Sequence, residues 1–230
     1  MEQPRVGVVI VAGGSGKRVG GALPKQFALV GGEPILARTI NAFRKALPAS
    51  RIVVVLPAEY IEFWKNFSAR FEVAKHTVVE GGKERFHSVK NGIEALSDAV
   101  DLIAVQDGVR PFATKELILG AVECALKNGS AIPVVKAVDS YRVVEGEESH
   151  IIDRTPLRLV QTPQIFSAPI LRAAYDTEFR TEFTDDASVV ECSGERIALC
   201  EGDYLNIKIT TPKDLILAEN IVESLSRIDD

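Results

Sequence analysis

Short runs of β-branched and other apolar residues alternate with segments of helical periodicity in the N-terminal part of the chain. The runs that predict strands are 6–12, 51–57, 72–80, 101–107 and 130–135. Apolar residues recur at helical spacing in 34–47, 82–98 and 114–129. Strands that are apolar throughout and are followed by helices are typical of a parallel sheet covered on both faces. The pattern therefore predicts a Rossmann-like, three-layer α/β fold with a mostly parallel sheet.

The segment after Val135 has a different pattern. Residues 136–166 alternate polar and apolar side chains around the turn sequence EGEES and lack helical spacing, which predicts a protruding β-hairpin arm at about 137–155. Thr211 before Pro212 fits the start of a C-terminal helix. Regular elements are expected to return in 167–179, 184–194, 196–202, 206–211 and 212–228. Because no repeat or low-complexity linker divides the chain, we expect one domain over residues 1–230.

Charge and composition exclude several classes of protein. A net charge of -5 argues against a general binder of nucleic acid or of membrane surfaces, since both need a basic field. No stretch approaches the roughly 20 apolar residues of a membrane helix, and the N-terminus has an acid where a signal peptide has bases. Cys124, Cys192 and Cys200 lack CxxC spacing, so neither a disulfide framework nor a zinc cluster is indicated. We expect a soluble, cytoplasmic protein.

A glycine-rich, cationic segment follows the first predicted strand, at the strand end where parallel sheets bind ligands. It is not a Walker P-loop, which would need glycine at Val11 and a hydroxyl at Arg18. It is not a dinucleotide fingerprint either, because Val19 stands where the third glycine belongs. Close backbone approach and several cations suit a triphosphate, and the residues concerned are Gly13, Gly14, Gly16, Lys17, Arg18 and Lys25. The alternative is a solvated glycine turn with surface lysines.

Seven motifs carry a resemblance to a known family. They are AGGSGKR, PKQF, GGKERFHSV, QDGVRPF, DRTPLRLVQTPQIF, TDDAS and NIKIT, in this order through nearly the whole chain. Together they resemble the 2-C-methyl-D-erythritol 4-phosphate cytidylyltransferases of isoprenoid precursor synthesis. The resemblance implies transfer of CMP from CTP to 2-C-methyl-D-erythritol 4-phosphate, with release of pyrophosphate and with Mg²⁺ or another divalent cation. The sister family, the ribitol 5-phosphate cytidylyltransferases, shares most of these motifs and is the alternative.

The resemblance also assigns roles to residues. The catalytic cations would be Arg18, Lys25 and Lys208. The nucleotide would be held by Ala12, Gly13, Gly14, Gly16, Gly82, Lys83, Ser88 and Asp107. The acceptor would be held by Asp107, Arg110, Ser140, Arg154 and Thr162. In the family the arm crosses to the other subunit of a homodimer, so Ser140 and Arg154 would serve the neighbouring site.

Some positions depart from the family's usual pattern, and other functions remain open. Gly13, Gln106 and Gly108 replace commoner residues where backbone contacts matter, whereas Ser140 and Leu205 do so nearer the acceptor. A dehydrogenase is excluded by the missing third glycine. The remaining alternative of another class is a non-catalytic nucleotide-binding regulator, because binding and catalytic sites look alike in sequence. On the residues alone, Asp107 could cap a turn, 81–89 could be an exposed helix start, and the hairpin could be solvated.

Overall fold

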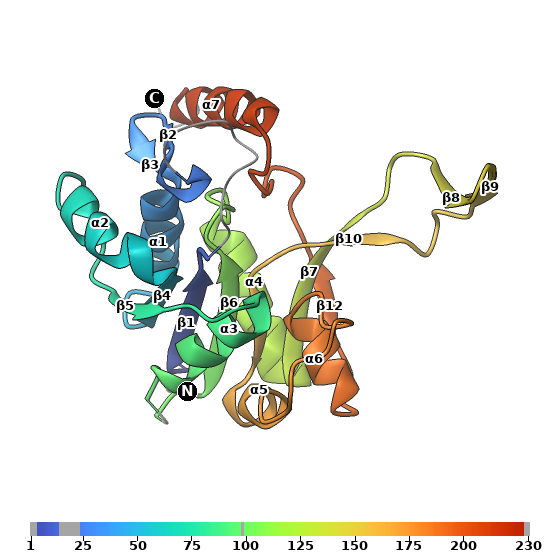
Figure 1. Cartoon of the computed structure of the whole chain (residues 1–230), viewed down its shortest axis with the longest axis horizontal. Helices are drawn as coiled ribbons and strands as arrows, with labels where there is room; N and C mark the ends of the chain where they lie inside the picture. The colour runs from blue at the N-terminus through green and yellow to red at the C-terminus, as the bar shows by residue number, and fades with distance from the viewer. Residues whose placement is uncertain (1–3, 14–23, 98, 228–230) are drawn as a thin grey trace.

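The fold is built on one central sheet. The computed structural model describes residues 4–13, 24–97 and 99–227. The strands, in the order in which they pair across the sheet, are β5 (Thr77–Glu80), β4 (Arg51–Leu56), β1 (Val6–Val11), β6 (Leu102–Asp107), β11 (Gln164–Ser167), β7 (Ser130–Lys136) and β10 (Arg158–Val160), and β12 (Leu199–Glu201) also pairs with β7. Figure 1 shows β1 and β6 near the middle of the molecule.

Strand directions confirm the predicted, mostly parallel sheet with one qualification. β1 pairs in parallel with β4 and with β6, and β4 pairs in parallel with β5. β11 runs antiparallel between β6 and β7, and β10 is antiparallel to β7. β1 is apolar on both faces because both are covered, so its sequence reads as one continuous apolar run.

Helices cover both faces of the sheet. One face packs against α1 (Ile35–Ala46), α2 (Ala58–Ser68) and α4 (Lys115–Asn128), and the other against α3 (Arg85–Glu94), α5 (Ala168–Ala174) and α6 (Asp186–Cys192). α7 (Pro212–Ser226) packs against β2 (Leu29–Val30), which pairs with β3 (Glu33–Pro34), and Figure 1 shows β2 beside α7. The Thr211 side chain caps α7 as predicted. None of the helices in the described ranges has the length and hydrophobicity needed to cross a membrane.

Four segments differ from the prediction. Residues 58–68, to which the sequence pattern assigned no element, form α2, in which only Trp64 is buried and the other apolar side chains are partly exposed. Residues 72–76, predicted as strand, lie outside β5 because the Asn41 side chain bonds the Glu72 carbonyl and the Ala74 N–H. Residues 206–211, predicted as regular structure, form neither helix nor strand. The predicted helix over 82–98 is shorter and spans Arg85–Glu94.

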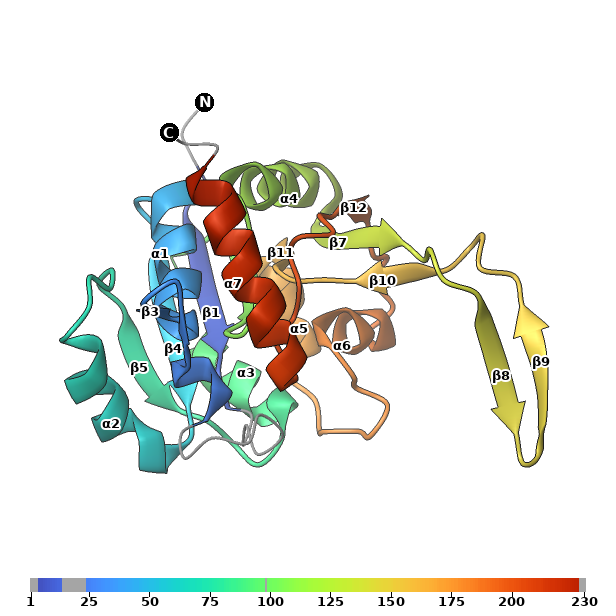
Figure 2. The same ribbon diagram turned by 90° about the horizontal axis from the view of Figure 1, so that it is seen from above.

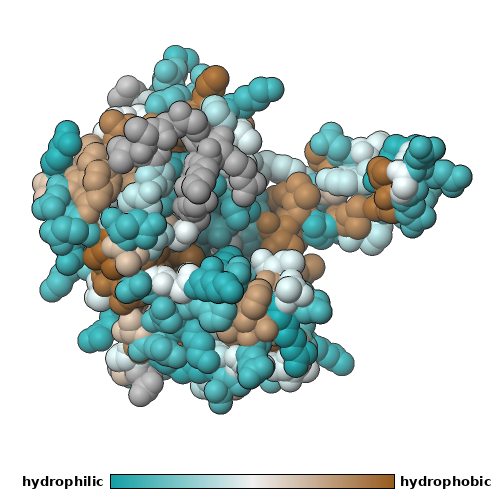
Figure 3. Space-filling view, in the orientation of Figure 1, coloured by the Kyte–Doolittle hydropathy of each residue, from teal (hydrophilic) through white to brown (hydrophobic). Residues whose placement is uncertain are grey.

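The predicted hairpin is present and projects from the body of the molecule (Figures 1 and 2). β8 (Tyr141–Glu145) and β9 (Glu148–Ile152) pair antiparallel through a two-residue loop. Gly146 occupies that loop with a φ of 64°, a conformation that favours glycine. Figure 3 shows apolar side chains at the base of the hairpin, where Val138, Leu159 and Val160 are exposed.

Candidate active site

A cavity of about 490 Å³ opens at the carboxyl ends of β1 and β6. β4 and β5 lie on one side of β1, and β6 lies on its other side. The strand order therefore reverses between β1 and β6. Open α/β sheets bind ligands at such a switch point. The predicted site residues that line the cavity are Ala12, Gly13, Lys25, Gly82, Lys83, Ser88, Asp107 and Lys208. The fold therefore brings together residues that lie almost 200 positions apart in the sequence.

The segment on either side of the glycine loop is fixed by buried contacts. Ala12 donates its N–H to Val55 O, and its carbonyl accepts the Gln26 Nε2–H at 2.9 Å. Lys25 begins the short 3₁₀ helix η2 (Lys25–Phe27), and Phe27 packs among the aromatic rings of α2. These contacts fix the position of the Lys25 backbone in the wall of the cavity. The predicted Gly14, Gly16 and Arg18 lie outside the described residues.

The loop before α3 forms the opposite wall. Gly82 donates its N–H to Ser88 Oγ at 3.1 Å, and the hydroxyl lies 3.2 Å from Glu84 O. A Cβ at Gly82 would come within 2.3 Å of the His87 Cβ, so only glycine fits there without displacement. The Ser88 side chain is buried and holds the loop in shape. Gly82, Lys83, Glu84 and Ser88 of this loop and of α3 line the cavity.

Asp107, the last residue of β6, lies among three cations. Its carboxylate is 2.9 Å from Lys208 Nζ, 3.5 Å from Arg110 Nε and 3.8 Å from Arg85 Nε. Burial would raise the pKa of Asp107, but attraction to Arg85, Lys208 and Arg110 outweighs it and lowers that pKa. Asp107 is therefore ionised near neutral pH and orients Lys208. Asp186 also pairs with Arg85, so three cations lie with two carboxylates here and the cluster keeps one excess positive charge.

Arg85 is held by a second buried carboxylate, an arrangement that the sequence analysis did not predict. Its Nη1 and Nη2 donate to both oxygens of Asp186 at 3.0 and 2.7 Å, and the Tyr175 hydroxyl donates to Asp186 Oδ1 at 2.6 Å. Asp186 is fully buried. Burial would lower the pKa of Arg85, but Asp186 outweighs it and raises that pKa; burial and then Asp186 raise the pKa of Tyr175. The TDDAS motif was the only sequence signal for Asp186.

Comparison with known proteins agrees with this geometry. The profile of the 2-C-methyl-D-erythritol 4-phosphate cytidylyltransferase (IspD) family matches residues 6–224. The chain belongs to this family. A relative of that name from Bacteroides thetaiotaomicron is 49% identical over 209 residues, covering 90% of this chain and 95% of the relative. Another from Geobacillus kaustophilus is 40% identical, covering 94% and 96%.

Solved structures of the family have the same fold. The cytidylyltransferase from Thermus thermophilus matches with a TM-score of 0.76 at 34% identity, covering 95% of this chain and 99% of that one. The 4-diphosphocytidyl-2C-methyl-D-erythritol synthase from Anaerococcus prevotii matches with a TM-score of 0.81 at 28% identity, covering 96% and 99%. The predicted family and fold are confirmed, and the predicted activity is the one for which the IspD family is named.

In this IspD family member the predicted acceptor residues fall into two groups. Arg110 contacts Asp107, and Thr162 accepts the Asp107 N–H through its hydroxyl at 3.1 Å. Ser140 and Arg154 instead lie at the ends of the hairpin, where Arg154 donates to Val138 O. None of these four residues is among the described residues that line the cavity, but Arg110 and Thr162 contact Asp107, which does.

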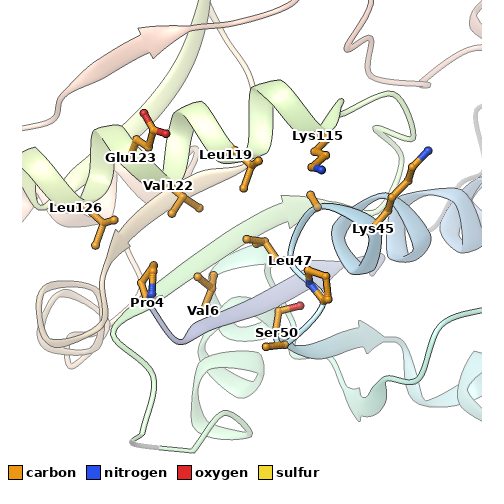
Figure 4. A pocket seen from close by; sticks show the side chains of 13 residues that line it. Pro4, Val6, Lys45, Leu47, Ser50, Lys115, Leu119, Val122, Glu123 and Leu126 are labelled. Atoms are coloured by element: carbon orange, nitrogen blue, oxygen red, sulfur yellow. The ribbon is translucent and has the colours of Figure 1, made fainter. Parts of the chain in front are cut away.

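A second cavity of about 490 Å³ lies at the other end of the sheet (Figure 4). Val6, the first residue of β1, lines it together with Leu47 of the α1 end and Val122 of α4. Apolar side chains dominate its wall, so it lacks the converging cations and backbone amides of the first cavity. The cavity beside Asp107 is therefore the candidate active site of this IspD family member.

The described residues offer little to hold a metal ion by themselves. Within the described ranges, no three His, Cys, Asp or Glu side chains form a group that could hold a metal. Asp107 and Glu84 are the acids that line the cavity, and Asp107 is already paired with Lys208. Mg²⁺ is commonly bound by one or two carboxylates together with substrate phosphates. The site fits a cation held mainly by the triphosphate.

The buried Arg85 and Asp186 pair gives a testable stability difference. Arg85→Met is expected to lower the free energy of unfolding by about 3 kcal/mol, because it leaves the Asp186 carboxylate buried without its cation. Arg5→Met is the matched control, since Arg5 and Asp101 form a similarly short pair whose side chains are 64% and 44% exposed. That control should change stability by about 1 kcal/mol or less. Urea unfolding measures both, and equal losses would contradict the expectation.

Proposed function

We propose that this chain transfers CMP from CTP to 2-C-methyl-D-erythritol 4-phosphate in the cavity beside Asp107. The observation that supports this most is the pairing of Asp107 with Lys208 at the switch point, opposite the wall that carries Lys25. In this proposal Gly82, Lys83 and Ser88, which line the cavity, bind the cytosine, and Arg110 and Thr162, which contact Asp107, bind the acceptor. Arg18, Gly14 and Gly16 are proposed to hold the triphosphate on the basis of sequence alone.

The chemistry follows from the charges. The acceptor phosphate attacks the α-phosphorus of CTP, the bond to the β-phosphate oxygen breaks, and pyrophosphate leaves. A phosphate monoester has a second pKa near 6, so it is already an ionised nucleophile at neutral pH and needs no general base. The protein's contribution is to align the two phosphates and to stabilise the negative charge of the transition state through Lys25, Lys208 and Arg18. When bound with CTP, Mg²⁺ would neutralise part of the triphosphate charge.

A panel of substrates tests this function. The protein is incubated with Mg²⁺, CTP and one sugar phosphate at a time, and pyrophosphate release is measured against a reaction without acceptor. We expect release with 2-C-methyl-D-erythritol 4-phosphate and a higher kcat/KM than with ribitol 5-phosphate. A preference for ribitol 5-phosphate would assign the other acceptor, whereas CTP binding without release would indicate a nucleotide-binding regulator.

The pH dependence should reflect the substrate and not Asp107. With CTP saturating, kcat/KM for the acceptor is expected to fall up to about tenfold per pH unit below about pH 6, as the acceptor phosphate becomes a monoanion. Because the pKa of Asp107 is lowered, that carboxylate stays ionised throughout this range and adds no acid limb. Initial rates between about pH 5 and pH 8 measure the profile. A constant kcat/KM down to pH 5 would contradict the dianion as nucleophile.

The proposed active form is a homodimer joined through the hairpin. Among the described strands, β8 and β9 pair only with each other, and an isolated two-stranded hairpin is marginally stable in water. Val144 and Ile151 on the hairpin are 71% and 68% exposed, which suits burial against a second copy. In a two-fold dimer each hairpin would carry Arg154 and Ser140 to the neighbouring acceptor site. The guanidinium of Arg154 suits a phosphate because it binds two oxygens at once.

A further inference from the structure

Asn206 is a fully buried polar residue in the irregular segment that carries Lys208. Its side-chain Nδ2 donates to the backbone O of Thr162 at 2.9 Å, and its backbone carbonyl accepts the Arg110 Nη1–H at 2.7 Å. Its Oδ1 has no hydrogen-bond partner among the described residues. The unmatched Oδ1 costs free energy in a buried place, so the defined contact of the Asn206 side chain is the hydrogen bond of its Nδ2 to Thr162 O.

The hydrogen bonds around Asn206 close a ring. Asp107 N donates to Thr162 Oγ1 at 3.1 Å, and Thr162 O accepts from Asn206 Nδ2. Lys208 lies two residues after Asn206, and its Nζ is 2.9 Å from Asp107 Oδ2, which closes the ring. Every other link of this ring is a backbone connection or a contact of Asp107. The Asn206 side chain is thus a side-chain link from the Lys208 segment to Thr162 and, through it, to Asp107, in addition to the backbone contacts of Asn206 O with Arg110 and of Ile209 N with Val109 O.

The irregular backbone makes this link necessary. Residues 206–211 have no strand ladder to fix their position. The segment is instead held at Asn206 and at Ile209, which is buried and donates its N–H to Val109 O at 3.0 Å. Lys208 lies between these two anchors, with its side chain 45% exposed toward the cavity. Loss of the Asn206 anchor would let the ammonium group move relative to Asp107.

We infer that Asn206 is a positioning residue for Lys208: its side-chain amide, bonded to Thr162 O, holds Lys208 where the transferring phosphate is stabilised. This inference rests on the proposed role of Lys208 in phosphate transfer. It assigns to Asn206 no contact with either substrate. Its effect is therefore on kcat and not on the affinity for CTP, because displacement of a catalytic group by about 1 Å can cost up to about 100-fold in rate.

A double-mutant cycle tests the inference. Asn206→Ala is expected to lower kcat about 10-fold and Lys208→Ala about 100-fold, with KM for CTP changed less than about twofold by the first. If Asn206 acts through Lys208, the double variant is no slower than Lys208→Ala, whereas independent effects would multiply to about 1000-fold. Asn206→Asp, which keeps the shape but replaces the donor with an acceptor facing Thr162 O, should lose kcat as much as the alanine variant.

Asn41→Ala is the matched control for a purely structural role. Its side chain also bridges separate segments, through Glu72 O and Ala74 N, but lies outside the candidate site. It should lose stability in urea unfolding while keeping wild-type kcat. Multiplicative losses in the cycle, a wild-type kcat in Asn206→Ala, or failure of both Asn206 variants to fold would overturn the inference. An inactive wild-type protein would instead refute the proposed function, and a fully active Lys208→Ala would refute the role of Lys208.

Discussion

Lys25→Ala is expected to lower kcat about 100-fold, equivalent to about 3 kcal/mol of lost transition-state stabilisation. Lys25 lines the cavity, and its place is set by η2 and by the packing of Phe27, so the charge is held in a fixed position. Removing it should leave the aromatic packing intact and the protein folded. The same loss is expected for Arg18→Ala from the sequence. Steady-state kinetics with both substrates, together with thermal unfolding, measure the two effects separately.

The matched control for this experiment is Lys45→Ala. Lys45 lines the apolar cavity at the opposite end of the sheet and is exposed. Its loss removes one positive charge from the protein without touching the candidate active site. We expect wild-type kcat for Lys45→Ala. Near wild-type turnover in both Lys25→Ala and Arg18→Ala would refute the assignment of these residues to the triphosphate.

Mixing two inactive variants is expected to restore activity. Arg154→Ala should be nearly inactive by itself, because each acceptor phosphate loses its guanidinium partner from the neighbouring chain. After exchange with Lys25→Ala, a mixed dimer has one site that combines an intact Lys25 with the other chain's intact Arg154. Equal mixing should then restore about a quarter of wild-type activity, since half of the dimers are mixed and each has one intact site.

Subunit exchange has to be shown independently for this test. Two differently tagged chains and co-purification provide that measurement, and each variant alone serves as the control. If the chains exchange but the mixture remains as inactive as its components, Arg154 does not act across the interface. An active monomer in sedimentation would likewise rule out a shared site.

The sequence predicted most of the fold because apolar periodicity records burial directly. β1, β4 and β6 were predicted to within a residue at each end, and α1 and α4 to within about one. The errors in the predicted elements lie where hydrogen bonds from side chains, and not strand-to-strand pairing, fix the backbone. Asn41 holds 72–76, and Asn206 with Ile209 holds 206–211. A hydrogen bond from a distant side chain leaves no periodic trace in the sequence.

The candidate site shows the same division. Lys25 was predicted from the cationic, glycine-rich segment that suits a triphosphate, whereas Gly82 and Lys208 were predicted from motifs that resemble those of the family. Arg85 was considered only as part of an exposed helix start, yet it forms a buried pair with Asp186, about 100 residues away. Gln26 and Asn206 were not singled out at all. Each acts by holding another group, so nothing in its neighbouring sequence identifies it.

The sequence by itself determined the alternation of buried strands and helices, the hairpin and the family. Those features depend on local periodicity and on short motifs, which neighbouring residues specify. Only the tertiary structure decided that β11 runs antiparallel beside β6 and that Asp107 lies among Arg85, Arg110 and Lys208. These features depend on distances between residues far apart in the chain, which are fixed only when the layers pack and buried charges find partners.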